Sequence, residues 1–427
     1  MKRRTISLMG FPAILILLCS VRGLAQDTVR ITLQEAEKQF LEKNLALLAE
    51  KYNIDIARAG VIQASLYSNP NLSLTGNIYN PQEKKAFDVS NRTGEYIVQV
   101  QQLIRLAGKR NKEISLASTN TRLSEDRFFD LLRTLRFSLR SNFYKAYYTL
   151  NSVTAYQTQL ASLEKLNTAY ENMQDKGVVT LKDAVRIKSL LYSLKGEQTS
   201  LLNDLNDIQA ELRLLMQNSK ATFIPVAGNN NDSLSAALRQ LDLAGLIDSA
   251  YANRHDLLLA GNNVRYNQQN YTLQKALATP DLTLGAQFDK RGSFVDNATF
   301  LQAAIDLPFF HRNQGNIQAA KIAITQSETL YKQQMGIVEN EVQRAYDKAL
   351  TTDKMLQYIK PGFRDDFEKL LQGITDNFQQ KNISLIEFTD FYESYKNNIL
   401  QFNQLGNERM QAIESLQFSV GKPLFNN

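Results

Sequence analysis

Cysteine, histidine and tryptophan are almost absent from this sequence of 427 residues. It has one cysteine, Cys19, two histidines, His255 and His311, and no tryptophan. Zinc and other soft metals take cysteine and histidine ligands, so no such site is expected within one chain. No Ser-His-Asp or metallohydrolase motif can be assembled either. The sequence therefore predicts no cofactor, no metal site and no enzymatic activity.

Long hydrophobic runs are missing beyond the first 25 residues. Basic residues at 2–4 precede an apolar run over about residues 8–18, and Gly23 and Ala25 supply the small residues of a cleavage site. We expect a secretory signal peptide over residues 1–25 that is removed together with the only cysteine. No later segment has the ~20 apolar residues of a transmembrane helix.

An excess of charge is missing as well. The chain has 49 basic and 43 acidic residues, and four of the basic ones lie in the predicted signal peptide, which leaves 45 against 43. A nucleic-acid-binding surface needs clustered lysine and arginine, and none occurs. We expect an exported protein that is near neutral and binds no nucleic acid.

The sequence does contain an internal repeat. Residues 68–80 (SNPNLSLTGNIYN) match residues 278–290 (ATPDLTLGAQFDK) at a shift of 210 positions, and residues 170–183 match residues 374–388 in the same order. We expect a first structural repeat, a linker or equatorial segment, a second repeat and a C-terminal tail, over residues 26–218, 219–240, 241–421 and 422–427.

Both repeats have the same predicted order of elements. Each begins with a helix of about 35 residues (33–67 and 242–277), which is followed by a proline and two strands. A polar helix of about 60 residues comes next (112–176 and 315–380), and it would be about 90 Å long. A tight turn then leads into a returning helix of about 35 residues.

The predicted strands are apolar on one side only, because apolar and polar residues alternate with a period of two. In the first repeat the apolar side is expected to hold Leu72, Leu74, Ile78, Tyr96, Val98 and Val100. In the second repeat it is expected to hold Leu282, Leu284, Ala286, Phe288, Leu301, Ala303, Ile305 and Leu307.

The long helices carry narrow apolar stripes, which are typical of coiled coils. An elongated coiled-coil protein would explain the helices, but four half-apolar strands have no evident sheet partner within the chain. β-strands that span a lipid bilayer must form a closed barrel, and four strands are too few to close one alone. The pattern favours an oligomeric tunnel to which several chains contribute strands.

The sequence resembles the TolC-like outer-membrane efflux proteins over essentially the whole predicted mature chain. The resemblance rests on the duplicated plan, on the strand starts NPNLSL and TPDLTL, and on the junction IDLPFFHRNQGNIQAAK at residues 305–321. It implies a mainly α-helical homotrimer with four membrane β-strands per chain, a 12-stranded barrel and a periplasmic α-helical tunnel. Segment 219–240 would contribute to a belt around the tunnel.

The resemblance also implies a function. Members of this family are passive exit ducts of tripartite efflux pumps or type I secretion systems in the cell outer membrane. Their partners are a periplasmic adaptor (membrane fusion) protein and an inner-membrane pump of the RND or ABC type. The cargo is mostly chosen by the pump, so it is not read from this sequence.

The two helical turns would form the periplasmic mouth of the tunnel, where the adaptor docks. The turn residues expected at the tips are Gly177, Val178, Asn382 and Ile383. By resemblance, Glu387 and Asp390 lie where acidic residues constrict the mouth, and Asp183 is a further acid nearby. Rings of carboxylates would favour cations and raise one another's pKa. The alternative is that they are solvated acids favoured at helix starts by the macrodipole.

A Tyr–Arg latch that closes the mouth in the best-known family member is not found here, because the aligned residues are Phe378 and Ile383. At the other end, strands are expected to meet long helices at junctions formed by Pro308, Phe309, Phe310, Gly315 and Gly108. His311 at this junction is expected to be an interfacial polar residue.

Two other classes of protein are considered. A periplasmic coiled-coil adaptor would share the hairpins and the export signal, but the Gly-rich lipoyl-like β-domain that it needs is missing. An enzyme on an elongated scaffold would need a catalytic motif, and none is present.

Overall fold

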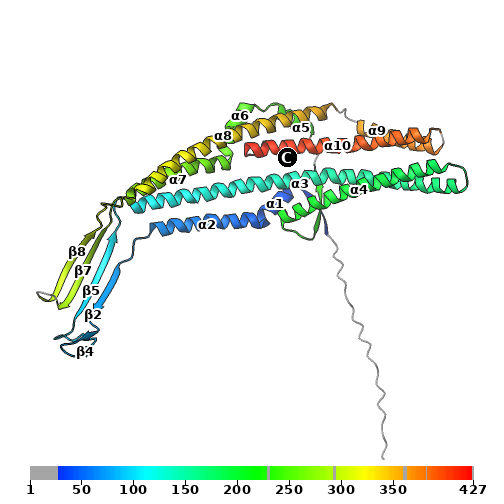
Figure 1. Cartoon of the computed structure of the whole chain (residues 1–427). Coiled ribbons are helices and arrows are strands. Elements are labelled where there is room, and N and C mark those ends of the chain that lie inside the picture. Colours follow the sequence, from blue (N-terminus) through cyan, green and yellow to red (C-terminus); the bar gives the residue numbers. More distant parts are fainter. Residues whose placement is uncertain (1–26, 228–230, 292–294, 359–362, 381, 426–427) are drawn as a thin grey trace, which may run out of the picture.

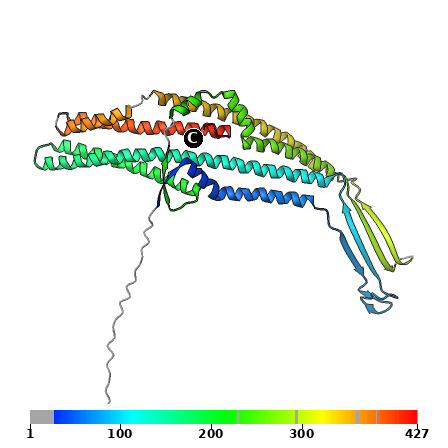
Figure 2. The ribbon, with the colours of Figure 1, turned by 180° about the vertical axis from the view of Figure 1, so that it is seen from behind.

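The computed structural model describes residues 27–227, 231–291, 295–358, 363–380 and 382–425. They form an elongated molecule with a β-sheet at one end, two helical turns at the other, and a helical bundle between them (Figures 1 and 2). The predicted signal peptide lies outside the described residues. Within these ranges, no helix has the length and apolar character needed to cross a membrane.

The first repeat contains strands and helices in the predicted order, with small additions. The elements are β1 (Asp27–Thr32), α1 (Leu33–Lys43), α2 (Leu45–Ser65), β2 (Asn71–Gly76), β3 (Tyr79–Asn80), β4 (Lys85–Ala86), β5 (Tyr96–Ile104), α3 (Lys109–Asp175) and α4 (Leu181–Met216).

The second repeat follows the same plan after the equatorial segment. The equatorial segment contains β6 (Ala221–Val226) and α5 (Asn231–Arg239). The second repeat contains α6 (Leu243–Asn253), α7 (His255–Leu277), β7 (Leu282–Arg291), β8 (Asp296–Ile305), α8 (Gln314–Gln357), α9 (Phe363–Gln379) and α10 (Leu385–Val420).

The first helix of each repeat is divided in two, where the sequence predicts one. Asn44 separates α1 from α2, and Arg254 separates α6 from α7, each with an extended backbone. The Asn44 side chain donates a hydrogen bond to the Leu215 carbonyl (3.0 Å), and the Arg254 side chain, 2% exposed, binds two carboxylates. The continuous helices predicted for 33–67 and 242–277 are therefore wrong at these points, because a buried polar side chain turns the chain without proline or glycine.

The long helix of the second repeat is also interrupted. The helix α3 is continuous over 67 residues, as predicted, whereas α8 ends at Gln357 and α9 begins at Phe363. The prediction of one helix over 315–380 is wrong. The sequence has Pro361 in this interval, and proline lacks the N–H that continues a helix.

A parallel strand pair near the middle of the molecule is not predicted from the sequence. The strands β1 and β6 pair over six residues. Gln209 of α4 donates a hydrogen bond to the Phe223 carbonyl (2.7 Å) and accepts one from the Phe223 N–H (2.9 Å), so β6 is tied to the bundle. The equatorial segment 219–240 thus begins with a strand that lies halfway along the bundle (Figure 1).

The bundle packs through narrow seams, as the apolar stripes predict. Buried residues recur at intervals of three, four or seven along the helices, which is the coiled-coil spacing. They include Leu139, Phe143, Ala146, Val153 and Leu160 of α3 and Ala184, Ile187, Leu191 and Leu194 of α4. One cluster occupies the middle of the molecule, and a second joins α3 and α4 to α9 and α10 near the turns.

Gly406 allows α10 to approach α3 closely. A Cβ atom there would lie 2.5 Å from Cε1 and 2.8 Å from Cζ of Tyr148. We expect Gly406→Ala to lower the free energy of unfolding by about 1–3 kcal/mol, because the Tyr148 ring must shift in a packed interface. The measurement is the melting temperature of the purified protein, with Gly336→Ala as control. No atom lies within 4 Å of a Cβ at Gly336, so this change should stabilise α8 by about 0.5–1 kcal/mol. Equal melting temperatures for the two variants would contradict the close contact.

The four predicted strands form one antiparallel sheet in the order β2-β5-β7-β8. The prediction of four such strands per chain is confirmed, and the strands pair with one another. The central pairing of β5 with β7 joins the two repeats. In the described part of the chain the outer edges of β2 and β8 pair with no other strand.

Candidate functional site

The register of the sheet sorts its side chains into two faces, because paired residues of antiparallel strands lie on the same face. One face carries Leu72, Leu74, Tyr96, Val98, Val100, Gln102, Ile104, Leu282, Leu284, Ala286, Phe288, Thr299, Leu301, Ala303 and Ile305. This confirms the predicted apolar side, apart from Ile78 and Leu307, which lie outside the strands.

The opposite face is mostly polar and nearly uncharged. It carries Asn71, Ser73, Thr75, Ile97, Gln99, Gln101, Leu103, Thr283, Gly285, Gln287, Asp289, Ala298, Phe300, Gln302 and Ala304. Three glutamines on this face are joined across the strands: Gln99 donates to Gln302, which donates to Gln287 (2.7 Å). Neighbouring side-chain amides therefore satisfy one another's hydrogen-bonding groups, and the face can still bind water.

The apolar face is exposed in the single chain. Leu72, Leu74 and Leu301 are 62%, 71% and 91% exposed. A continuous apolar surface of this kind is unfavourable in water and marks a contact with lipid or with another protein. The sheet thus has one exposed apolar face and one mostly polar face.

Left-handed residues form the turns from the sheet into the long helices. Gly108 (φ 65°) precedes α3, and Asn313 (φ 57°) precedes α8. The turn predicted at Gly315 is wrong, since this glycine lies within α8 and Asn313 makes the turn two residues earlier. Asparagine tolerates this conformation, and the Asn313 side chain donates to the Gln274 carbonyl (2.8 Å).

Aromatic residues follow the end of the last strand. The strand β8 ends at Ile305, and after Pro308 the side chains of Phe309 and Phe310 are 67% and 95% exposed. Nearby, the Lys109 ammonium, which is almost fully buried, lies 2.6 Å from the Asp281 carboxylate. This ion pair holds the start of α3 against the start of β7.

The two helical turns at the far end are built in the same way. Gly177 is left-handed (φ 71°), and the Val178 N–H donates to the Met173 carbonyl (2.9 Å). The Asn382 N–H makes the same bond, five residues back, to the Asn377 carbonyl (2.9 Å). The tips of both hairpins therefore end in equivalent backbone turns, next to each other at one end of the molecule (Figure 1).

Two of the three predicted acids are helix caps. Thr180 begins α4 and donates to Asp183 (2.7 Å), and Ser384 begins α10 and forms a capping box with Glu387. Hydrogen bonds from the backbone and side chain of Ser384 lower the pKa of the Glu387 carboxyl. In the single chain these acids stabilise helix starts, as the alternative interpretation predicts.

Asp390 lies in a different environment. It lines a groove of about 490 Å³ between α4 and α10, together with Glu387, Glu393, Lys396 and Arg186. Arg186 follows its cap Thr180 at the same interval at which Asp390 follows Ser384. The first repeat thus contributes a cation where the second contributes an acid, a feature missed in the sequence analysis although the repeat alignment contains it.

The residues at the latch positions belong to the core of the tips. Phe378 is buried, and its ring stacks against Tyr170 (centroids 5.8 Å apart) and Phe388 (4.3 Å). Ile383 packs partly buried against the same cluster. Both side chains serve packing within one chain. Over the described ranges, no group of three or more metal-binding side chains occurs.

Comparison with known proteins agrees with this geometry. Residues 246–422 match the family model described as outer membrane efflux protein. The chain is 19% identical over 394 residues to the cobalt-zinc-cadmium resistance protein CzcC of Cupriavidus metallidurans, covering 92% of this chain and 90% of that protein.

Two solved structures have the same fold. A membrane protein from Pseudomonas aeruginosa superposes with a TM-score of 0.73 at 18% identity, covering 91% of this chain and 92% of that one. The Campylobacter jejuni CmeC outer membrane channel superposes with a TM-score of 0.74 at 12% identity, covering 91% and 85%. Residues 246–422 thus carry an outer membrane efflux protein domain, and the chain has the fold of the TolC-like outer-membrane channels that its sequence resembles.

Proposed function

We propose that this protein is the outer-membrane exit duct of a tripartite efflux or type I secretion system, through which substrates pass without bond chemistry. The observation that supports this most is the sheet, which has an exposed apolar face, an amide-rich face and two open edges. A sheet in lipid must have no free edge, because unpaired backbone groups are costly there. Three copies joined from β2 to β8 would close a barrel of twelve strands.

The long helices have the length that the tunnel of such a duct needs. The helix α3 has 67 residues and would extend about 100 Å, which is far more than a bilayer requires. In a trimer the helical bundles would form a tunnel in the periplasm, with the turns at its inner mouth. An adaptor protein would dock at Gly177, Val178, Asn382 and Ile383, and an inner-membrane pump of the RND or ABC type would supply the energy.

The names of the similar proteins support the same proposal. CzcC is described as a resistance protein for cobalt, zinc and cadmium, and CmeC as an outer membrane channel. Among the described residues no cluster could hold a metal ion as a resident cofactor, so a metal would be a cargo in transit.

Two measurements test the proposal. We expect the chain to be recovered in the outer-membrane fraction as a trimer, and to form conducting channels when reconstituted in planar bilayers. Recovery as a soluble periplasmic monomer would overturn the exit-duct function and favour a coiled-coil adaptor or structural protein.

At the inner mouth, we propose that Glu387, Asp390 and Asp183 give three copies a cation-attracting rim. Asp390→Asn should lower the cation selectivity of single channels, because it removes a carboxylate that caps no helix. Arg186→Gln should raise the selectivity, because it removes the opposing cation. The measurement is the reversal potential in a salt gradient, with Glu125→Gln, which changes a partly exposed acid of the bundle, as control. If neither mouth variant shifts the reversal potential, these residues have no part in selectivity.

A further inference from the structure

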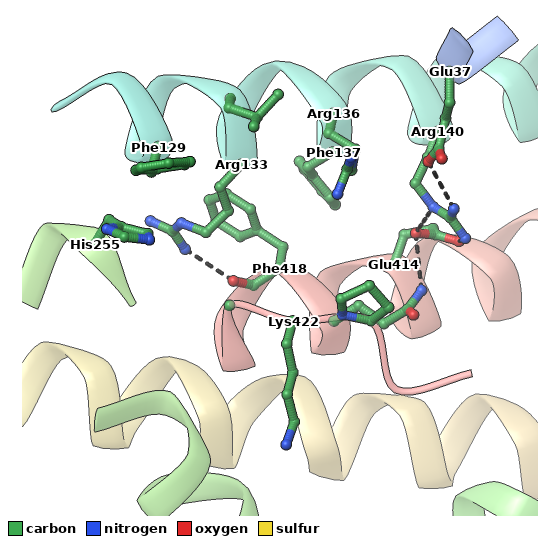
Figure 3. A pocket seen from close by; sticks show the side chains of 14 residues that line it. Glu37, Phe129, Arg133, Arg136, Phe137, Arg140, His255, Glu414, Phe418 and Lys422 are labelled. Carbon is green, nitrogen blue, oxygen red and sulfur yellow. Dashed lines mark hydrogen bonds and ion pairs between the residues drawn. The ribbon is translucent and has the colours of Figure 1, made fainter. Parts of the chain in front are cut away.

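A pocket of about 470 Å³ lies beside the end of α10, far from both the sheet and the tips. It is lined by α3 and α10, with Glu37 of α1 and His255 of α7 at its margins (Figure 3). Neither the duct nor the mouth uses it.

Three arginines on successive turns of α3 line this pocket. Arg133 binds Asp130 (2.7 Å) and donates to the Phe418 carbonyl (2.8 Å). Arg140 is held by Glu37 (2.9 Å) and Glu414 (2.5 Å). The first and last arginines of the row are therefore neutralised within the chain.

The middle arginine, Arg136, has no such partner. Its Nε atom is buried and makes no hydrogen bond, and no ion pair joins its guanidinium to an acid in the described part of the chain. The guanidinium also lines the pocket, so an anion inside the pocket would form charge-assisted hydrogen bonds with its terminal nitrogens and supply the missing counter-charge.

The remaining walls are mainly apolar and aromatic, and Gln417 and Lys422 also line the pocket. The rings of Phe137 and Phe418 are 4.8 Å apart, and Phe129 stacks on His255 at 4.7 Å. Leu132 and Pro423 complete the walls. The volume lies in the range of small-molecule sites, which combine such walls with a few polar groups.

We propose that this pocket binds an amphiphilic organic anion, whose carboxylate or sulfonate pairs with Arg136 and whose apolar body packs on Phe129, Phe137 and Phe418. A small inorganic anion would leave the aromatic walls without a contact. A neutral apolar molecule would leave Arg136 without a partner. The pocket therefore favours a ligand that has both an anionic group and an apolar body.

Binding of 2-naphthoate to the full chain in lipid nanodiscs tests the proposal, with empty nanodiscs subtracted. We expect saturable binding that weakens at least tenfold in Arg136→Met and weakens less in Arg136→Lys, which keeps the charge. The matched control is Arg127→Met, which removes an exposed arginine of the same helix and should leave binding unchanged. Neutral 2-naphthalenemethanol should bind at least tenfold more weakly than the carboxylate.

Three outcomes would overturn the proposal. The first is that the wild-type chain does not bind 2-naphthoate, as would happen if a neighbouring copy closed the pocket in the trimer. The second is that Arg136→Met binds 2-naphthoate as tightly as the wild type does. The third is that the neutral alcohol binds as tightly as the carboxylate, which would make the pocket a purely apolar one.

Discussion

Replacement of Leu301 by arginine is expected to prevent stable assembly of the protein in the outer membrane. Leu301 is 91% exposed at the centre of the apolar face of β8. If this face meets lipid, an arginine near the bilayer midplane costs about 2–4 kcal/mol in each chain. A closed trimer would carry the cost three times. The measurement is the amount of trimer in washed outer membranes.

The same strand provides the control. Ala304 lies on the opposite, polar face and is exposed, so Ala304→Arg should leave the amount of trimer close to that of the wild type. Both variants add the same charge to the same strand, on opposite faces and three residues apart. Equal loss of trimer in both would mean that the apolar face does not meet lipid.

A second large effect is expected from Arg409→Met in the middle of the bundle. Arg409 of α10 and Asp353 of α8 form an ion pair (2.8 Å) and are 1% and 4% exposed. Loss of the arginine leaves a buried carboxylate without its counter-charge, which costs about 3–5 kcal/mol. Ser235 also binds Asp353 (2.7 Å), but a hydroxyl does not replace a full positive charge. The expected result is a much lower melting temperature of the purified protein.

An exposed ion pair serves as comparison. Lys188 and Glu171 lie 3.0 Å apart with about half of each side chain exposed, so Lys188→Met should cost less than about 1 kcal/mol. The double variant Arg409→Met/Asp353→Leu should recover much of the lost stability, since the Asp353 carboxylate is removed together with its counter-charge. A double variant that is no more stable than Arg409→Met would assign the loss to packing.

Features with a short sequence period could be predicted before the fold was known. The faces of the strands follow from alternation in stretches such as NLSLTG, and the coiled-coil seams follow from spacings of three and four. Because the two halves of the chain repeat, each strand or helix assigned in one half could also be assigned in the other. The turns at Gly177 and Asn382 fit this pattern, because the chain must reverse between two apolar stripes.

Features that depend on one distant partner could not be predicted in this way. The helix break at Asn44 depends on a hydrogen bond to Leu215, and the break at Arg254 depends on carboxylates elsewhere in the chain. The pairing of β1 with β6 joins strands almost 200 residues apart. The turn was expected at Gly315 because glycine is the usual left-handed residue, whereas Asn313 is anchored in that conformation by Gln274.

The sequence predicted the position of the candidate site better than it predicted the role of each residue in it. The acids were found at the tips, but sequence alone could not distinguish the capping Glu387 from Asp390, which faces a groove shared with Arg186. The arginine row was overlooked because each arginine is an ordinary helix residue, and its meaning depends on which acids lie opposite.

The pairing of β5 with β7 has a mechanical consequence. It clamps the two repeats together at the sheet, whereas their helical tips lie at the opposite end of the molecule (Figure 1). Since the repeats also pack on one another along the bundle and near the turns, the whole chain is a lever about 100 Å long whose pivot lies at the sheet. A rotation too small to disturb the strands becomes a displacement of several ångströms at the tips. In the proposed trimer, the sheets would thus keep their shape while the tips of the three chains move apart.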